Sequence, residues 1–269
     1  MSDYLAPLPV QQVAAWYRRL ADSIGSRRVA DVDSTGTTQQ REPLAAILLR
    51  HYLENRQPGS AFVFDAPNYL KQNGQVLTQL QYQRAVFLTE QQARVGNRQI
   101  WAGVLPRIQG RSPFTRWDLT GPLQMNYESL AEIGGTMIEI ARIQYRGTDQ
   151  ERDLFSALRG FQVHSDVVVT GQRLPTGMVR IAIQSWTASA RDTYDFDFSE
   201  HLTLPNPDFH STAADAVRPQ DESLTVYHSN AQRLEQAHLA APYTLASRGW
   251  SVTDARLTSP AQVDPRRTL

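Results

Sequence analysis

The eleven residues from Arg191 to His201 combine side chains that can hydrolyse a phosphate ester. Carboxylates at Asp192, Asp195 and Asp197 stand close to the phenol of Tyr194 and the imidazole of His201. One or two carboxylates can hold Mg²⁺ while its remaining positions take water and phosphate oxygens. An imidazole with an intrinsic pKa of about 6.5 can give or take a proton near neutral pH. The segment can therefore supply a metal site, with Asp192 and Asp195 as ligands, and a proton-transfer group.

The same segment also fits an ordinary amphipathic strand. Side chains alternate along an extended chain, so Tyr194, Phe196 and Phe198 share one face and Asp195 the other. The aromatic rings would then enter the core and the aspartates would face water. Asp192 shares the face of Tyr194, and aspartate is a poor strand former, which favours a functional role. Both interpretations stay open at this point.

The motif Asp192-x-Tyr194-Asp195 followed by His201 resembles the active-site signature of colicin M-type bacteriocins. Members of that family are magnesium-dependent hydrolases that cleave lipid II, the undecaprenyl-diphosphate-linked peptidoglycan precursor, between lipid and pyrophosphate. The resemblance implies catalytic roles for these four residues, Mg²⁺ bound by the two aspartates, and a lipid-linked phosphate substrate. The family has an arginine after the histidine, where this chain has Leu202. A bidentate phosphate contact is therefore missing at that position.

A wider pattern resembles an uncharacterised bacterial family associated with type VI secretion and interbacterial competition. The pattern joins Arg191–Phe196 to the downstream residues Val226–Asn230. It adds Arg191, His228 and Asn230 as candidate substrate-binding residues, although Asn230 also suits a helix N-cap. This resemblance implies an antibacterial effector with an immunity protein and a secretion-apparatus partner. The alternative is a non-enzymatic adaptor or interaction domain of the same machinery.

Other groups of reactive residues are weaker candidates. His164, Ser165 and Asp166 cannot form a triad, because consecutive strand residues point to opposite faces. Asp208 and His210 follow a bend with two prolines and can contribute to the edge that carries Asp195. The sequence contains no His-Glu-x-x-His or Gly-x-Ser-x-Gly motif, which disfavours zinc hydrolases and serine esterases.

The composition limits the cellular role. Basic and acidic residues both number 27, so the zero net charge argues against a general nucleic-acid binder. Cysteine is absent, which excludes disulfides and thiolate chemistry. We expect no membrane span, since no uncharged apolar run reaches about 18 residues, and no signal peptide at Met1–Leu5. An effector of this kind would be cytoplasmic in the producer and would act in the periplasm of target cells.

Hydrophobic periodicity predicts the elements that must position these residues. The predicted helices cover 8–24, a segment from Pro43 to before Pro58, 126–144 and 230–238. The predicted strands cover 61–65, a hairpin of 163–169 and 178–183 turning at 174–177 and continuing towards Tyr194, and 224–227. Residues 30–41, 204–208 and 209–221 are expected to be irregular, 75–88 fit neither period, and 260–269 form a frayed tail.

These elements predict an α+β fold. An N-terminal helical half should pack on a mostly antiparallel, curved β-sheet in the C-terminal half. The helical region covers 1–150, the β-rich catalytic region 151–258 and a flexible tail 259–269, within one compact unit.

Overall fold

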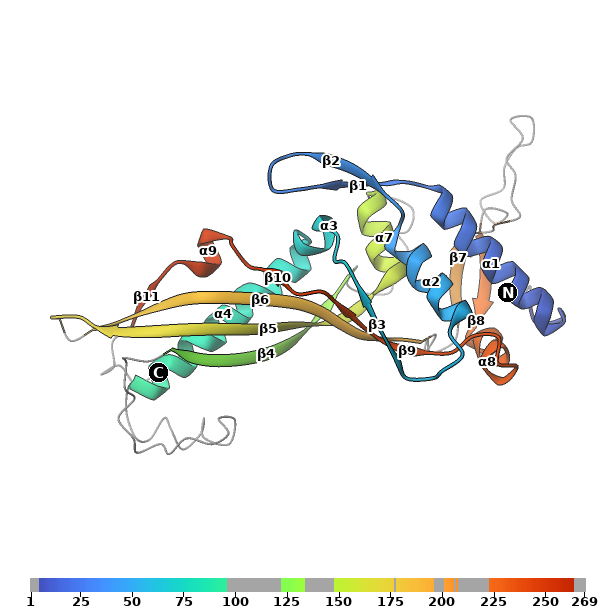
Figure 1. The fold of residues 1–269 in the computed structure, drawn as a ribbon. Coiled ribbons are helices and arrows are strands. Elements are labelled where there is room, and N and C mark those ends of the chain that lie inside the picture. The colour runs from blue at the N-terminus through green and yellow to red at the C-terminus, as the bar shows by residue number, and fades with distance from the viewer. Residues whose placement is uncertain are drawn as a thin grey trace. The chain divides into compact units, whose positions relative to one another are not determined.

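The computed structural model describes residues 5–95, 122–133, 148–176, 178–195, 201–205, 207 and 223–263. The fold is α+β, as the sequence predicts (Figure 1). Its helices are α1 (Val10–Ser26), α2 (Leu44–Glu54), α3 (Asn68–Lys71), α4 (Gly74–Val95), α7 (Asp149–Ala157), α8 (His228–Gln236) and α9 (Ala255–Thr258). Its strands are β1 (Val29–Val32), β2 (Thr38–Arg41), β3 (Ser60–Phe64), β4 (Leu123–Glu132), β5 (Gly160–Arg173), β6 (Val179–Tyr194), β7 (His201–Pro205), β8 (Ser223–Tyr227), β9 (Tyr243–Ser247), β10 (Trp250–Ser251) and β11 (Ala261–Val263).

The chain divides into two compact units, each assembled from three segments. The first unit takes Met1–Tyr69, Glu132–Gly160 and Arg191–Ala246, and the second takes Leu70–Ala131, Phe161–Ala190 and Ser247–Leu269. The largest sheet has the strand order β3-β9-β6-β5-β4, and β10 and β11 also pair with β6. β1 with β2 and β7 with β8 form separate two-stranded antiparallel sheets.

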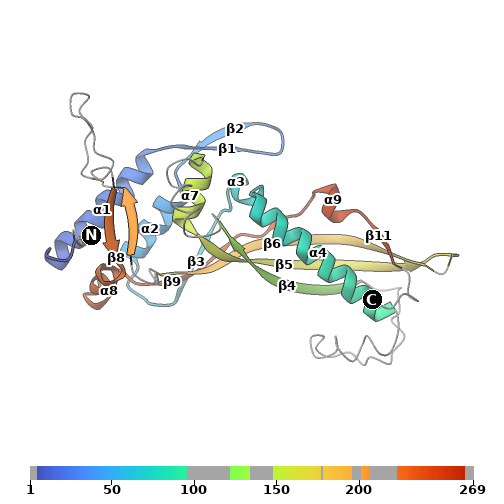
Figure 2. The same cartoon turned by 180° about the vertical axis from the view of Figure 1, so that it is seen from behind.

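The second unit contains the predicted hairpin, which is confirmed as β5 and β6. The N–H of Leu174 donates to the Met178 carbonyl at 2.8 Å across the turn. Helix α4 lies across β4 and β5 (Figure 2). It is fixed there by the buried amide of Gln83, which donates to the Val163 carbonyl at 2.8 Å and to Ser129 Oγ at 2.7 Å. The segment 75–88, which the sequence left unassigned, is therefore a core helix.

The predicted helix over 126–144 is wrong in its first part, where the chain forms strand β4. Burial alternates along this strand, with Met125 and Ala131 buried and Gln124 and Leu130 exposed. Leu130 is 49% exposed, although it is apolar. When this solvent-facing residue is counted with the buried ones, the spacing of apolar residues looks helical, which explains the wrong prediction. Residues 134–147 lie outside the described ranges.

The predicted irregular segment over 30–41 is also wrong, because its two ends pair as β1 and β2. Val29 lies opposite Arg41, and Val32 lies opposite Thr38. The turn between them is closed by the Asp33 carboxylate, which accepts the N–H groups of Thr35 and Thr37 at 2.8 and 2.9 Å. β2 is mostly exposed and consists of polar residues. It therefore lacks the hydrophobic alternation by which a strand is predicted from sequence.

Smaller differences concern the ends of elements. Leu204 and Pro205, predicted to be irregular, belong to β7 and lie opposite Leu224 and Ser223. A proline is tolerated there because it ends a strand of a two-stranded sheet, where one side of each strand has no ladder. The predicted tail is wrong over Ala261–Val263, which pairs with β6. Residues 209–221 lie in a part of the chain that the structure leaves undescribed.

In the first unit, the Asp153 carboxylate fixes the start of helix α2. The N-cap of α2 is Pro43, whose side chain offers no hydrogen bond. Asp153, on α7 and 5% exposed, instead accepts the N–H groups of Leu44 and Ala45, both at 2.8 Å. The hydroxyl of Tyr69 donates to the same carboxylate. A negative charge at this end also complements the helix dipole. A side chain from another helix thereby caps α2.

We expect Asp153→Ala to lower the free energy of unfolding by about 3 kcal/mol, because it leaves two buried helix N–H groups and a hydroxyl without an acceptor. Chemical denaturation measures this loss. Asp149→Ala is the matched control on the same helix, because that carboxylate is exposed and, among the described residues, its side chain pairs with Arg152 alone. We expect it to change stability by less than about 1 kcal/mol. Equal effects of the two substitutions would contradict the cap.

Candidate functional site

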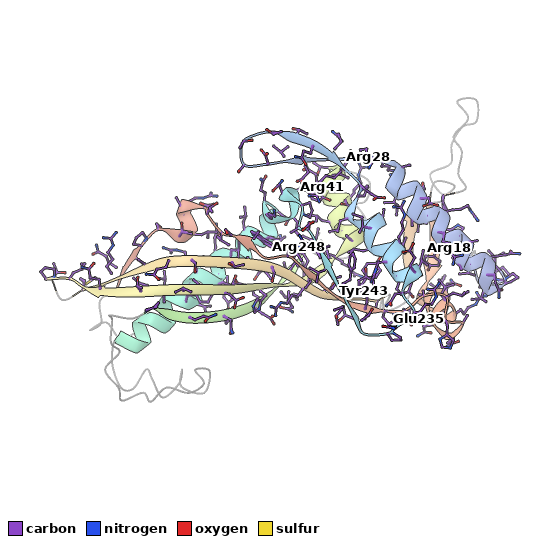
Figure 3. All side chains as sticks on the ribbon, viewed as in Figure 1. Arg18, Arg28, Arg41, Glu235, Tyr243 and Arg248 are labelled. Carbon is purple, nitrogen blue, oxygen red and sulfur yellow. The ribbon has the colours of Figure 1, made fainter. Side chains whose placement is uncertain are left out.

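The first unit contains a cavity of about 350 Å³ that includes part of the predicted site. It is lined by Gly59, Thr193, Asp195, His228, Glu235, Pro242, Tyr243 and Thr244. These residues come from the end of β6, the turn before β3, both ends of α8, and β9 with the residue before it. Asp195 and His228, 33 positions apart in the chain, are thus brought to one cavity. Figure 3 shows Glu235 and Tyr243 where α8 and β9 meet.

The antiparallel pairing of β6 with β9 builds one wall of this cavity. Thr193 lies opposite Thr244, and both are exposed at the cavity. Asp195 follows two residues after Thr193 and is also exposed. Because side chains alternate along a strand, Thr193 and Asp195 share the cavity face. This wall therefore offers two hydroxyls and a carboxylate.

Tyr194 belongs to the opposite face of β6 and packs among aromatic rings. Its ring stacks on Tyr243 at a centroid distance of 5.2 Å and lies 6.0 Å from the ring of Tyr52. Burial raises the pKa of Tyr194, so its hydroxyl stays protonated at neutral pH. The ring does not line the cavity. Its predicted role in positioning a phosphate oxygen stays a prediction.

The aromatic cluster connects β9 to α2 and β3. The imidazole of His51 stacks on Phe62 at 4.1 Å and meets Tyr243 edge-on at 4.5 Å. Burial lowers the pKa of His51, which keeps its ring neutral in this apolar setting. The hydroxyl of Tyr243 donates to the Leu48 carbonyl at 2.9 Å. These contacts fix the floor of the cavity, because Tyr243 also lines it.

Asp192 shares the face of Tyr194, so the two predicted metal ligands point to opposite sides of β6. Burial is the largest cause that raises the pKa of Asp192, which reaches about 7, and the charge of Asp195 raises it further. The hydrogen bond that the Thr193 N–H donates to this carboxyl acts in the opposite direction and lowers the pKa. Because this pKa is raised, a cation would have to displace the proton in order to bind Asp192. Within the described ranges, no group of three or more His, Cys, Asp or Glu side chains can hold a metal ion.

Asp195 by itself fits a magnesium site of another kind. Mg²⁺ commonly binds one or two carboxylates and completes its shell with waters and substrate phosphates. The exposed carboxylate of Asp195 at the cavity can serve as such a ligand. The assignment of Asp192 as a second ligand stays a prediction.

Helix α8 supplies His228 from its first residue, directly after β8. Asn230 is not the N-cap that its type suggests, because the cap is Tyr227, which makes no side-chain cap bond. Asn230 is 0% exposed, and its Oδ1 accepts a hydrogen bond from Arg233 at 3.1 Å. Arg191 is exposed and lies opposite Ala246. Neither Asn230 nor Arg191 lines the cavity, and their substrate-binding roles stay predictions.

The backbone of His201 lies beside the chain that leads into α8. His201 is the first residue of β7 and lies opposite Tyr227, the residue before His228. The β7–β8 ladder thus brings two histidines, far apart in sequence, to the same end of a two-stranded sheet. The position of the His201 side chain, and residues Asp197, Asp208 and His210, lie outside what the structure describes.

Glu235 is a charged residue of the cavity that the sequence analysis did not predict. It lies seven residues after His228 on α8, and residues seven apart share one helix face. Its Oε1 accepts a hydrogen bond from the Tyr52 hydroxyl at 2.7 Å. The spacing from His228 was the available signal, but it becomes meaningful only once His228 is placed at a cavity.

The rim of the cavity is held by Asn55, the C-cap of α2. Its side-chain amide donates to the Ala241 carbonyl at 3.1 Å, and its Oδ1 accepts the N–H of Gln57 at 3.0 Å. Gly59, at a φ of +75°, donates its N–H to the Pro242 carbonyl at 3.0 Å. A left-handed backbone favours glycine at this position. The turn after α2 is therefore tied to the segment before β9.

We expect Asp192 to make folding stability depend on pH. Its folded-state pKa of about 7 lies above the ordinary value of 3.8, so the folded protein holds this proton more tightly. The contribution of Asp192 to the free energy of unfolding therefore falls as pH rises from about 4 to 7 and levels off above. Asp192→Asn keeps the acceptor oxygen and removes the titration. It should be more stable than wild type at about pH 8, by on the order of 2 kcal/mol after solvent screening, and equal near pH 4.

Urea unfolding at the two pH values measures this difference, with Asp149→Asn as an exposed control. A stability difference between wild type and Asp192→Asn that is the same at both pH values would show that Asp192 titrates normally in the folded protein.

Comparison with family models, curated proteins and solved structures finds no match to this chain. The resemblance to the colicin M-type signature therefore stays a prediction. Among the described helices, none combines the length and apolar composition of a membrane span.

Proposed function

We propose that this protein is an antibacterial effector that hydrolyses a lipid-linked diphosphate, in the manner of colicin M-type enzymes. The observation that supports the proposal is the shared cavity of Asp195 and His228. Asp195 belongs to the motif that resembles the colicin M-type signature, and His228 belongs to the wider pattern, in which it is a candidate substrate-binding residue. A solvated, purely structural acidic strand gives no reason for its aspartate to share a cavity with an imidazole from a helix far along the chain.

The cavity residues suit phosphate chemistry. His228 is the first residue of α8, where the helix dipole favours an anion. From there its imidazole can donate a proton to an oxygen that leaves phosphorus. The hydroxyl of Thr193 can donate a hydrogen bond to a phosphate oxygen. The hydroxyl of Thr244 already donates to the Ser60 carbonyl at 3.2 Å. Asp195 would hold Mg²⁺, which, when bound, neutralises charge on the phosphate oxygens.

The absence of the family's arginine affects how the substrate charge is balanced. Position 202 is leucine, and none of the eight described lining residues is lysine or arginine. In the colicin M-type family, an arginine guanidinium can balance the negative charge of the substrate phosphate. In this chain that charge would be balanced by the positive end of α8, by His228 and by a cation on Asp195. We expect activity to depend strongly on the divalent cation.

Delivery and protection belong to the same proposal. An effector that cleaves a periplasmic precursor has to leave the producing cell through a secretion apparatus. The producer then requires an immunity protein. An immunity protein that covers the cavity would block substrate entry directly.

The alternative function is a non-enzymatic adaptor of the same machinery. Two observations favour it: Leu202 stands in place of the arginine, and Tyr194 packs between Tyr52 and Tyr243. In this case the cavity has no catalytic role. Thermal unfolding with and without Mg²⁺ separates the alternatives, because a ligand of the native state raises stability by about 2.7 kcal/mol at a hundredfold excess over Kd.

We expect Asp195→Asn and His228→Asn each to reduce hydrolysis of a polyprenyl-diphosphate-linked substrate by about 10²- to 10⁴-fold, because each removes a group that acts on the phosphate. Thin-layer chromatography of the released lipid measures the rate. Periplasm-targeted expression in a test bacterium measures lysis by the same variants and by His201→Asn. Asp149→Asn, which changes an exposed carboxylate, is the control, and it should cause as much lysis of the test bacterium as wild type does.

Folding of each variant is checked by circular dichroism. If folded Asp195→Asn and His228→Asn cleave the substrate as fast as wild type, the cavity is not the active site.

A further inference from the structure

We propose that Glu235 is a further catalytic residue of this cavity, the general base for the attacking water, and that Tyr52 positions it. The inference rests on the proposed hydrolase function. It concerns two residues outside the acidic motif, and the arrangement of α8 and α2 carries it.

Helix α8 presents two reactive groups to the cavity from its two ends. His228 is its first residue and Glu235 its eighth, and both line the cavity. Seven residues make almost two full turns, so the side chains share one face about 10 Å apart along the axis. A substrate phosphate near the N-terminal end of α8 lies on the side where the helix dipole favours anions. The carboxylate stands towards the opposite end, so a water that it holds would attack the phosphate from the side away from His228.

The hydroxyl of Tyr52 holds one oxygen of Glu235. Tyr52 is 0% exposed and donates to Oε1 at 2.7 Å. Burial raises the pKa of Tyr52, and the hydrogen bond and charge of Glu235 raise it further. Tyr52 is therefore a donor throughout the neutral range, and Oε1 is its acceptor. Among the described residues, no side chain or backbone group donates to Oε2. That oxygen has the capacity to accept a water proton.

Tyr52 is itself fixed by its surroundings. Its backbone carbonyl accepts the N–H of Ala241 at 3.2 Å, and its ring lies 6.0 Å from that of Tyr194. The Asn55 amide ties the end of the same helix to the Ala241 carbonyl. A base that is held in place before substrate arrives loses little entropy when it reacts. The buried phenol of α2 thus gives Glu235 a defined orientation.

The proposed step conserves atoms and charge. Glu235 takes one proton from water as the water oxygen bonds to phosphorus. The bond between phosphorus and the lipid oxygen breaks, and this oxygen takes the proton of the protonated His228 imidazole. The products are the polyprenyl alcohol and the diphosphate, which keeps the rest of the substrate attached. One proton then passes from Glu235 through solvent to His228, which restores the starting state.

The test compares steady-state kinetics of wild type, Glu235→Gln, Tyr52→Phe and Glu54→Gln on the polyprenyl-diphosphate-linked substrate. Glutamine keeps the shape of Glu235 and cannot take the proton, so kcat should fall about 10²- to 10⁴-fold with KM changed by less than about threefold. The decrease in rate at acidic pH (the acidic limb of the pH–rate profile) that wild type is expected to show should be absent in Glu235→Gln. Tyr52→Phe should lower kcat about tenfold and retain this acidic limb, because it leaves the base in place. Glu54 is an exposed carboxylate of α2, and its variant should match wild type.

Each outcome decides the inference. If wild type hydrolyses the substrate and folded Glu235→Gln keeps its kcat and its pH profile, Glu235 is not the base, while the proposed function stands. If wild type shows no hydrolysis, the proposed function and this inference both fail. If Glu235→Gln does not fold, Glu235→Asp replaces it: a lower kcat with the acidic limb retained supports the base, and an unchanged kcat overturns it.

Discussion

The carboxylate of Asp153 is the constraint on which the cavity depends. It accepts the first N–H groups of α2, so it sets where that helix begins. The other end of α2 carries Tyr52, which orients Glu235, and is followed by Asn55, which holds the rim. A helix is rigid over three turns, so an error in its start is transmitted to its end. The buried carboxylate of Asp153 therefore helps to place Tyr52 and Asn55, whose bonds reach Glu235 and the Ala241 carbonyl.

The second determinant is the alternation of side chains along β6. It divides a compact sequence motif between two environments. Asp195 faces the cavity with Thr193, whereas Tyr194 joins an aromatic cluster with Tyr243 and Asp192 becomes half-buried. The raised pKa of Asp192 is the electrostatic consequence of that division. The segment thus provides two residues that line the cavity, Thr193 and Asp195, and one that packs against its floor, Tyr194. Helix α8 supplies His228 and Glu235.

Local signals made much of this fold predictable. Helices α1 and α2, strands β3 and β8, and the β5–β6 hairpin follow from periodicity and turn residues close in sequence. β1 and β2 were missed because polar, exposed strands lack a hydrophobic pattern, and β4 because Leu130 faces solvent. The assembly of each unit from three distant segments depends on contacts that no local window contains.

The candidate site was predictable to a similar extent. Asp195 and His228 stand in recognisable patterns, and both line the cavity. Glu235 was not found, because a glutamate near the end of a polar helix is ordinary in sequence. Its importance depends on the hydrogen bond from the Tyr52 hydroxyl, 183 positions away, which only the three-dimensional structure reveals.

We propose that substrate occupies the cavity between β6, α8 and β9. The chain has no cysteine, so Thr244→Cys places a single thiol on the cavity wall. The most direct measurement is the alkylation rate of this thiol with and without a non-hydrolysable polyprenyl diphosphate analogue. We expect a saturating analogue to slow alkylation at least about tenfold, since a bound ligand covers the thiol. An unchanged rate, with binding of the analogue shown by calorimetry, would place the substrate elsewhere.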